Sequence, residues 1–224
     1  QLYIQPHMNT NLKLIKKAEN LGFKALVITI DAPISGIRNS EQRAGFYLPD
    51  GISAINIENL NPIQTTTNFE NVFDVVSSLP TWKDIEFIKQ NTKLPVILKG
   101  ITSASYAKKA VDLGIDGIIV SNHGGRTIDT LPSTIELLPK IAKAVENKIP
   151  ILLDGGIRRG SDIIKAIALG ASAVMIGRPI MYGLATAGAL GVAHTLKILK
   201  EELEVSMIFT GCKTLKDINK NILF

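Results

Sequence analysis

The sequence predicts an α/β protein built as a (β/α) barrel, and three observations support this class. Short apolar segments alternate with amphipathic helical segments, one helix–strand unit recurs three times, and polar and glycine residues follow every expected strand. Alternation of this kind is typical of a parallel sheet. With 224 residues and 46% hydrophobic content, the chain can bury a core of single-domain size, so we expect one domain over residues 1–224.

The recurring unit is a helix end followed by a short buried strand. A Leu-Gly pair closes the helix in each copy, at Leu21-Gly22, Leu113-Gly114 and Leu169-Gly170, and a wholly apolar run follows within a few residues. Glycine just past a helix end accepts the left-handed conformation that terminates many helices. Wholly apolar runs, here residues 26–28, 118–120 and 174–176, are typical of strands buried on both faces of a parallel sheet.

Three further strands are expected at residues 1–5, 95–98 and 151–153, which makes six. The helical segments carry apolar residues at spacings of three and four, as at Leu12, Ile15 and Ala18, and each therefore presents one apolar stripe to a core.

The distribution of polar residues favours a barrel over a doubly wound sheet. A barrel assembles its site from all the loops at the carboxyl ends of its strands, whereas a doubly wound sheet concentrates its site at one switch point. Because six strands do not close an eight-stranded barrel, we expect a (β/α)₈ TIM barrel that is truncated at its N-terminus. The irregular residues 34–80 are expected to form a long loop or lid insertion.

Composition restricts the partners. The net charge is +5, but the lysines are scattered along helical segments, which indicates a solvated basic surface and no nucleic-acid partner.

Cys212 is the only cysteine, so no intramolecular disulfide is expected. Neither an apolar run of about 18 residues nor a signal-peptide pattern is visible, and a cytoplasmic location is expected. No residue is assigned to a metal.

Two glycine-containing loops predict a phosphate site. Gly155 and Gly156 end one strand ahead of a helix, while Gly177 and Arg178 end the last strand. In barrels the loops after the last two strands commonly bind phosphate, since glycine lets backbone N–H groups approach it. Arg158 or Arg178 would add a bidentate contact. The alternative is a pair of tight turns with solvated arginines.

His123 and Arg126 predict a base beside an anion-binding group. They lie three residues apart on a glycine-rich loop at a strand end, and Asp31 at another strand end could hydrogen-bond one ring nitrogen and leave the other free as a base. Lys99, also at a strand end, needs an anionic partner. Either a bound anionic group or an ion pair with Asp31 or Asp154 would provide it.

These motifs together resemble the FMN-dependent α-hydroxy-acid oxidase and dehydrogenase family, which includes glycolate oxidase, lactate oxidase and lactate-oxidising flavocytochromes. The similarity runs from Gln1 to about Ile218, nearly the whole chain. Its most specific pieces are residues 98–101, 119–126, 154–160 and 176–179.

The resemblance implies a role for each matching residue. His123 would be the active-site base with Asp31 bonded to it, and Arg126, Arg38 and Tyr3 would bind the substrate. The remaining matches would contact FMN: Gln1, Thr29, Lys99, Ser121, Asp154, Gly155, Gly156, Arg158, Gly177 and Arg178.

The implied reaction is oxidation of a small L-2-hydroxy acid, lactate- or glycolate-like, to the 2-oxo acid, in an enzyme that is often a homotetramer. Oxygen, a quinone or a cytochrome could accept the electrons. Two alternatives stay open: an FMN-dependent prenyl-diphosphate isomerase with similar phosphate loops, and a non-catalytic flavoprotein fragment. The chain departs from the family in one main respect: two strands are absent, and with them segments that in the family supply backbone contacts to the flavin ring.

Overall fold

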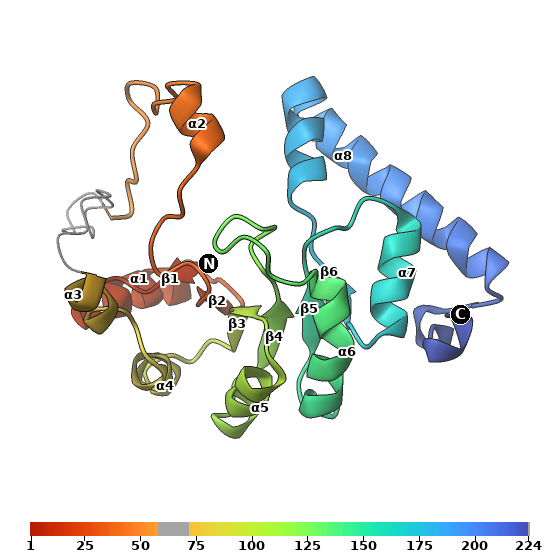
Figure 1. The fold of residues 1–224 in the computed structure, drawn as a ribbon, viewed down its shortest axis with the longest axis horizontal. Helices are drawn as coiled ribbons and strands as arrows, with labels where there is room; N and C mark the ends of the chain where they lie inside the picture. Colours follow the sequence, from red (N-terminus) through yellow and green to blue (C-terminus); the bar gives the residue numbers. More distant parts are fainter. Residues whose placement is uncertain (58–71, 224) are drawn as a thin grey trace. The chain divides into compact units, whose positions relative to one another are not determined.

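A computed structural model describes residues 1–57 and 72–223 of the chain and shows six parallel strands alternating with helices (Figure 1). The strands are β1 (Leu2–Tyr3), β2 (Leu26–Thr29), β3 (Val96–Ile101), β4 (Gly117–Val120), β5 (Ile151–Leu153) and β6 (Ala173–Val174). The helices are α1 (Met8–Asn20), α2 (Asn39–Arg43), α3 (Val72–Ser77), α4 (Trp82–Gln90), α5 (Ala104–Asp112), α6 (Thr134–Val145), α7 (Gly160–Ala168) and α8 (Arg178–Phe209), followed by 3₁₀ turns at Leu215–Asp217 and Lys220–Ile222. The six expected strands are confirmed, although the first and the last are shorter than predicted.

The chain divides into two compact units, Gln1–Ile97 and Leu98–Phe224. In the first unit β1 pairs in parallel with β2, with Tyr3 opposite Thr29, and the Leu26 N–H donates to the Pro95 carbonyl, 2.8 Å away, just ahead of β3. In the second unit β4 pairs with β5 and β5 with β6, again in parallel. The carboxyl ends of neighbouring strands therefore lie at one edge within each unit.

The first unit buries Ile15 of α1 with Leu26 and Ile28 of β2. The end of α1 is fixed by Glu19, whose carboxylate accepts hydrogen bonds from the Thr92 hydroxyl at 2.8 Å and the Lys93 N–H at 2.9 Å. The same contacts hold the pKa of Glu19 at about 2, since each donor stabilises the ionised form.

The second unit is built around β4, all of whose residues are buried, as its apolar sequence predicts. Helix α6 packs on it through Leu138, Ile141 and Val145, which recur at three- and four-residue spacing. Farther along, α7 and the end of the chain share a small cluster of Ile164, Ala168, Cys212 and Ile218.

The repeated Leu-Gly unit ends α1, α5 and α7 in the same way. Gly22, Gly114 and Gly170 have φ of 77°, 70° and 112°. The next residue then donates its N–H to a carbonyl five residues earlier in every copy, as Phe23 does to Ala18. This left-handed glycine reverses the chain into the following strand, which explains the constant spacing in the sequence.

Helix α8 contains a sharp bend that its sequence pattern did not predict. Ala187 (φ −148°) and Gly188 (φ 57°) leave the helical conformation, and the two halves fold back on each other in Figure 1. A Cβ on Gly191 would lie 1.9 Å from the Gly183 carbonyl oxygen, so only glycine permits this approach.

The expected loop at residues 34–80 contains α2 and α3, and its residues 58–71 lie outside the described part of the chain. The lid assignment stays a prediction. Within 1–57 and 72–223, none of the helices combines the length and the apolar character needed to cross a bilayer.

Candidate active site

The second unit contains a pocket of about 270 Å³ at the carboxyl ends of its strands. The lining residues come from β3 and from the segments that follow β4, β5 and β6, including the first two residues of α8. They are Lys99, His123, Gly124, Arg126, Asp154, Gly155, Gly156, Ile157, Arg158, Met175, Ile176, Gly177, Arg178 and Pro179. The pocket therefore gathers nearly all of the residues of this unit that the sequence singled out.

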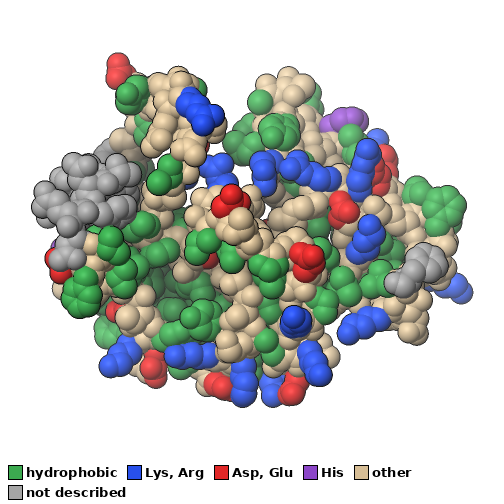
Figure 2. Space-filling view, in the orientation of Figure 1, with side chains coloured by type: hydrophobic (Ala, Val, Ile, Leu, Met, Phe, Trp, Pro, Cys, Tyr) green, Lys and Arg blue, Asp and Glu red, His purple; other side chains and the backbone are tan. Residues whose placement is uncertain are grey.

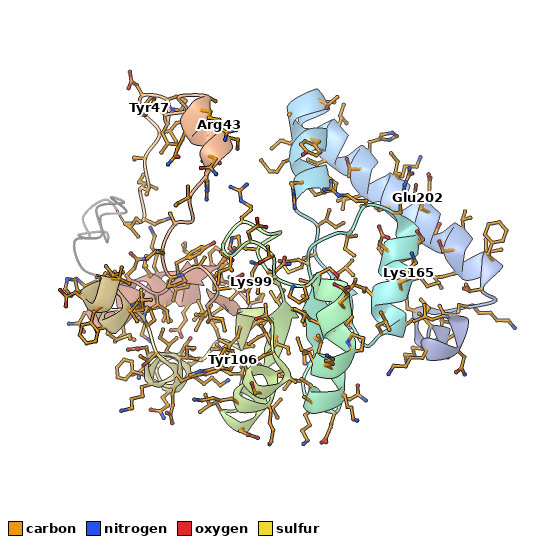
Figure 3. All side chains as sticks on the ribbon, viewed as in Figure 1. Arg43, Tyr47, Lys99, Tyr106, Lys165 and Glu202 are labelled. Carbon is orange, nitrogen blue, oxygen red and sulfur yellow. The ribbon has the colours of Figure 1, made fainter. Side chains whose placement is uncertain are left out.

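Lys99 and Asp154 line the pocket, and the buried Ser121 is hydrogen-bonded to Asp154. Lys99 is only 8% exposed, and its Nζ lies 3.7 Å from Asp154 Oδ2, which also accepts a hydrogen bond from the Ser121 hydroxyl at 2.9 Å. The ion pair that the sequence left as one alternative for Lys99 is thus present. Lys99 lies within β3 and is labelled in Figure 3.

Asp154 also carries an unsatisfied oxygen. Its Oδ1 atom is buried and, among the described residues, has no hydrogen-bond partner. A buried carboxylate oxygen without a donor costs free energy unless a bound group supplies one. Because Asp154 lines the pocket, a hydroxyl-bearing ligand fits this oxygen.

The loop that carries His123 has an unusual backbone. His123, Gly124 and Gly125 all have positive φ, of 57°, 66° and 74°. Positive φ is uncommon for a residue other than glycine, and such conformations cluster at functional sites. The Ser121 hydroxyl accepts the His123 N–H at 3.1 Å, and this contact ties the loop to Ser121 and, through it, to Asp154.

Asn122, which the sequence reasoning passed over, stabilises the same loop. Its Oδ1 accepts the Gly124 N–H at 3.1 Å, and its Nδ2 donates to the Pro132 carbonyl at 3.2 Å. An asparagine ahead of two glycines is a common turn signal, which could have identified this residue.

Thr134, the first residue of α6, holds the loop after β5 and was also missed. Its hydroxyl donates to the Asp154 carbonyl at 2.5 Å. Gly155 has φ of 87°, and a Cβ there would lie 3.1 Å from the Thr134 hydroxyl oxygen. The Ser133–Glu136 capping box in the sequence marks the start of α6, but no sequence signal reports this contact.

The arginines occupy different places. Arg158 and Arg178 line the pocket, and Arg178 also donates to the Gly124 carbonyl at 3.0 Å, which links the loops after β4 and β6. Arg159 lies outside the lining and pairs with Glu202 at 2.7 Å. Asp162 Oδ2 accepts the N–H groups of Arg158 and Arg159, each at 2.9 Å, so these amides at the start of α7 are occupied by a side chain.

The first unit holds the other predicted residues. Gln1 Nε2 donates to the Thr29 hydroxyl at 2.6 Å and lies 3.4 Å from the Tyr3 hydroxyl. Asp31 follows β2 and has a buried Oδ2, whereas Arg38 is exposed ahead of α2 and pairs with Glu41 at 3.3 Å. Gln1, Tyr3 and Thr29 are thus brought together, as their positions on neighbouring strands predict.

The fold and the pocket define a parallel α/β protein of the barrel type with a site for a ligand that carries both hydroxyl and anionic groups. Guanidinium groups and flexible glycine backbone suit phosphate, while the Asp154 oxygen suits a hydroxyl donor. The sequence profile of the FMN-dependent dehydrogenase family matches residues 1–224. The chain belongs to this family, whose cofactor is FMN.

Curated relatives support the assignment. The chain is 44% identical over 225 residues to a 2-hydroxyacid oxidase of Dictyostelium discoideum, which matches 100% of this chain and 58% of that protein. It is 43% identical to glycolate oxidase 3 of Arabidopsis thaliana (98% of this chain, 61% of that protein) and 41% identical to an L-lactate oxidase of Nostoc sp. (100% and 63%). The chain thus spans about 60% of the length of these relatives.

Solved structures agree in fold. A mandelate oxidase bound to 3,3-difluoro-2-hydroxy-3-phenylpropionic acid matches with a TM-score of 0.85 at 40% identity, over 98% of this chain and 61% of that one. A mandelate oxidase mutant with a C4a-OH-FMN adduct matches with a TM-score of 0.82 at 40% identity, over 95% and 59%. The six-stranded fold therefore corresponds to part of an FMN-dependent oxidase.

Proposed function

We propose that this protein is an FMN-dependent oxidoreductase that oxidises a small L-2-hydroxy acid, lactate- or glycolate-like, to the 2-oxo acid. The observation that carries the proposal is the placement of His123 and Arg126 in one pocket with the Gly156 and Gly177 loops. A base and a carboxylate-binding group thereby share a site with groups suited to a phosphate-bearing cofactor.

In this proposal FMN is held from the second unit by its phosphate and ribityl groups. Arg158, Arg178 and the backbone of the two glycine loops bind the phosphate, and Asp154 Oδ1 accepts a ribityl hydroxyl. Asp154 Oδ1 supports this role because it is buried without a protein donor in the described part of the chain. The ring contacts of this unit are Lys99 and Ser121.

The first unit contributes Gln1 and Thr29 to the flavin. Their mutual hydrogen bond of 2.6 Å supports a shared function, because each can still use a second polar group toward a ligand. FMN supplies the acceptor for the two electrons that leave the substrate.

The protein's residues bind the substrate and move the proton. The Arg126 and Arg38 guanidiniums pair with the substrate carboxylate and orient it, and Tyr3 donates a hydrogen bond. His123 removes a proton from the substrate, with Asp31 fixing the imidazole orientation. A positioned base of this kind contributes about 10² to 10⁴ in rate.

The relatives bear on the electron acceptor. Those named above are oxidases or hydroxyacid oxidases, which supports oxygen as the electron acceptor over a quinone or a cytochrome. A homotetramer and a cytoplasmic location stay predictions.

The test is anaerobic reduction of the flavin. The purified chain is loaded with FMN, and glycolate, L-lactate or L-mandelate is added while the flavin absorbance is followed. Bleaching by a hydroxy acid supports the proposal. Bound flavin that no 2-hydroxy acid bleaches contradicts it, and turnover of isopentenyl diphosphate by the reduced protein would instead identify a prenyl-diphosphate isomerase.

A further inference from the structure

We infer that Glu202 is a positioning residue for the phosphate end of the pocket. It lies on α8, outside the pocket, and acts through the loop that carries Gly156 and Arg158. This inference rests on the proposed function, because it concerns how the FMN phosphate site is held.

The Glu202 carboxylate bridges two groups at the start of α7. Its Oε1 accepts from the Arg159 guanidinium at 2.7 Å, and its Oε2 accepts from the Gly160 N–H at 2.9 Å. Hydrogen bonds in which the donor or the acceptor is ionised are roughly twice as strong as bonds between neutral groups. One side chain therefore fixes both the side chain of Arg159 and the backbone of the next residue.

This bridge separates the functions of two adjacent arginines. Arg158 lines the pocket, whereas Arg159 is turned away from it by its ion pair with Glu202. Asp162 accepts the backbone N–H groups of both arginines. Asp162 and Glu202 together hold the backbone from Arg158 to Gly160. Contacts within the protein therefore set the direction of the Arg158 side chain before a ligand binds.

Close packing of α7 against α8 places the bridge. A Cβ on Gly160 would lie 2.0 Å from the Leu203 backbone nitrogen, so α7 begins directly against α8. Figure 3 labels Glu202 on the part of α8 that runs beside α7. Glycine at this position lets the two helices approach closely, which brings the Glu202 carboxylate within hydrogen-bond distance of the Gly160 N–H.

Helix α8 thereby connects both walls of the pocket. Its first residue, Arg178, belongs to the wall after β6, and after the bend at Gly188 the same helix returns to bind the wall after β5 through Glu202. The separation of Arg158 and Arg178 is in this way determined by α8. Positioning of this kind affects a ligand's phosphate more than its ring.

The experiment compares FMN with riboflavin, which lacks the phosphate. Dissociation constants for both are measured by flavin fluorescence for the unaltered chain, Glu202→Ala and Glu202→Gln. We expect Glu202→Ala to weaken FMN binding about tenfold, which corresponds to about 1.4 kcal/mol, and to leave riboflavin binding within about twofold. Glu202→Gln keeps the side-chain length and an acceptor for the Gly160 N–H. We expect it to weaken FMN binding less than Glu202→Ala does and to leave riboflavin binding unchanged.

Glu204→Ala is the matched control, since Glu204 lies on the same helix and makes an exposed pair with Lys200 at 3.6 Å. It should leave both constants unchanged. Equal weakening of FMN and riboflavin by Glu202→Ala would show a merely structural role and overturn the inference, as would unchanged FMN binding. If the unaltered chain itself binds FMN no more tightly than riboflavin, the proposed phosphate site is wrong. That result contradicts the proposed function, whereas the two outcomes for Glu202→Ala contradict only the role of Glu202.

Discussion

The Ser121 hydroxyl donates to Asp154 Oδ2 at 2.9 Å and accepts the His123 N–H at 3.1 Å. Ser121 thus connects Asp154, which lines the pocket, with the backbone of the loop that carries the proposed base. The hydroxyl has a donor and an acceptor role at once, which only serine or threonine could supply at this buried position.

Asp154→Asn should weaken FMN binding about tenfold. The amide cannot neutralise Lys99 or accept as strongly from a ribityl hydroxyl. Fluorescence titration with FMN measures the loss. Asp112→Asn is the control, because Asp112 makes an exposed pair with Lys108 at 3.2 Å in the same unit. Equal effects of the two substitutions on FMN binding would show that Asp154 does not contact FMN.

Replacing His123 should abolish flavin reduction while flavin stays bound. We expect the anaerobic bleaching rate to fall by about 10² to 10⁴ in His123→Ala. His123→Asn should behave alike, and it tolerates the left-handed backbone better than alanine does. Stopped-flow absorbance gives the rate and the spectrum gives the bound flavin. Normal bleaching in either variant would disprove the assignment of the base.

Arg126→Lys should raise KM for the hydroxy acid sharply, about tenfold or more, because lysine cannot form the planar bidentate contact with a carboxylate. Steady-state kinetics over a range of substrate concentration tests this expectation. A control is Lys140→Arg, which alters an exposed cation on α6. An unchanged KM in Arg126→Lys would place the substrate carboxylate elsewhere.

Glu19 should make the free energy of unfolding depend on pH in the acid range. Its pKa is lowered from 4.5 to about 2, first by the Lys93 N–H and then by the Thr92 hydroxyl and Lys16. Since the folded state favours the ionised carboxylate, its contribution is fully present above the ordinary Glu pKa and is lost as pH falls from about 4.5 toward 2.

Glu19→Gln should therefore lower the free energy of unfolding at pH 7 and flatten its slope between pH 4.5 and 2. Urea denaturation at several pH values measures both, with Glu86→Gln on the exposed face of α4 as control. An unaltered slope in Glu19→Gln would contradict the role of these hydrogen bonds.

The sequence predicts well what depends on local conformation. Gly22, Gly114 and Gly170 have the left-handed backbone that their Leu-Gly pattern indicates, and the apolar runs after them are strands. The loops of His123, Asp154 and Gly177 fall at strand ends, as their position after apolar runs implies. Parallel pairing then brings these loops to one edge without any further information.

Long-range contacts could not be predicted in the same way. The Thr134 hydroxyl meets a carbonyl 20 residues away, and the Gly160 N–H meets a carboxylate 42 residues away. The bend in α8 could not be predicted because a glycine inside a helical pattern is usually tolerated. The need for glycine becomes visible in the structure, where Gly183 and Gly191 approach each other closely. The exposed surface of the second unit mixes Lys and Arg with Asp and Glu along α5 and α6 in Figure 2, in keeping with the scattered charges of the sequence.

The central claim is that the two glycine loops with Arg158 and Arg178 bind the phosphate of a flavin. It is tested most directly by the ratio of the dissociation constants of riboflavin and FMN for the unaltered chain and for Arg158→Ala and Arg178→Ala. We predict that FMN binds at least about tenfold more tightly than riboflavin, and that each substitution removes most of this difference. Equal affinity for the two flavins in the unaltered chain, or a preference that survives both substitutions, would contradict the account.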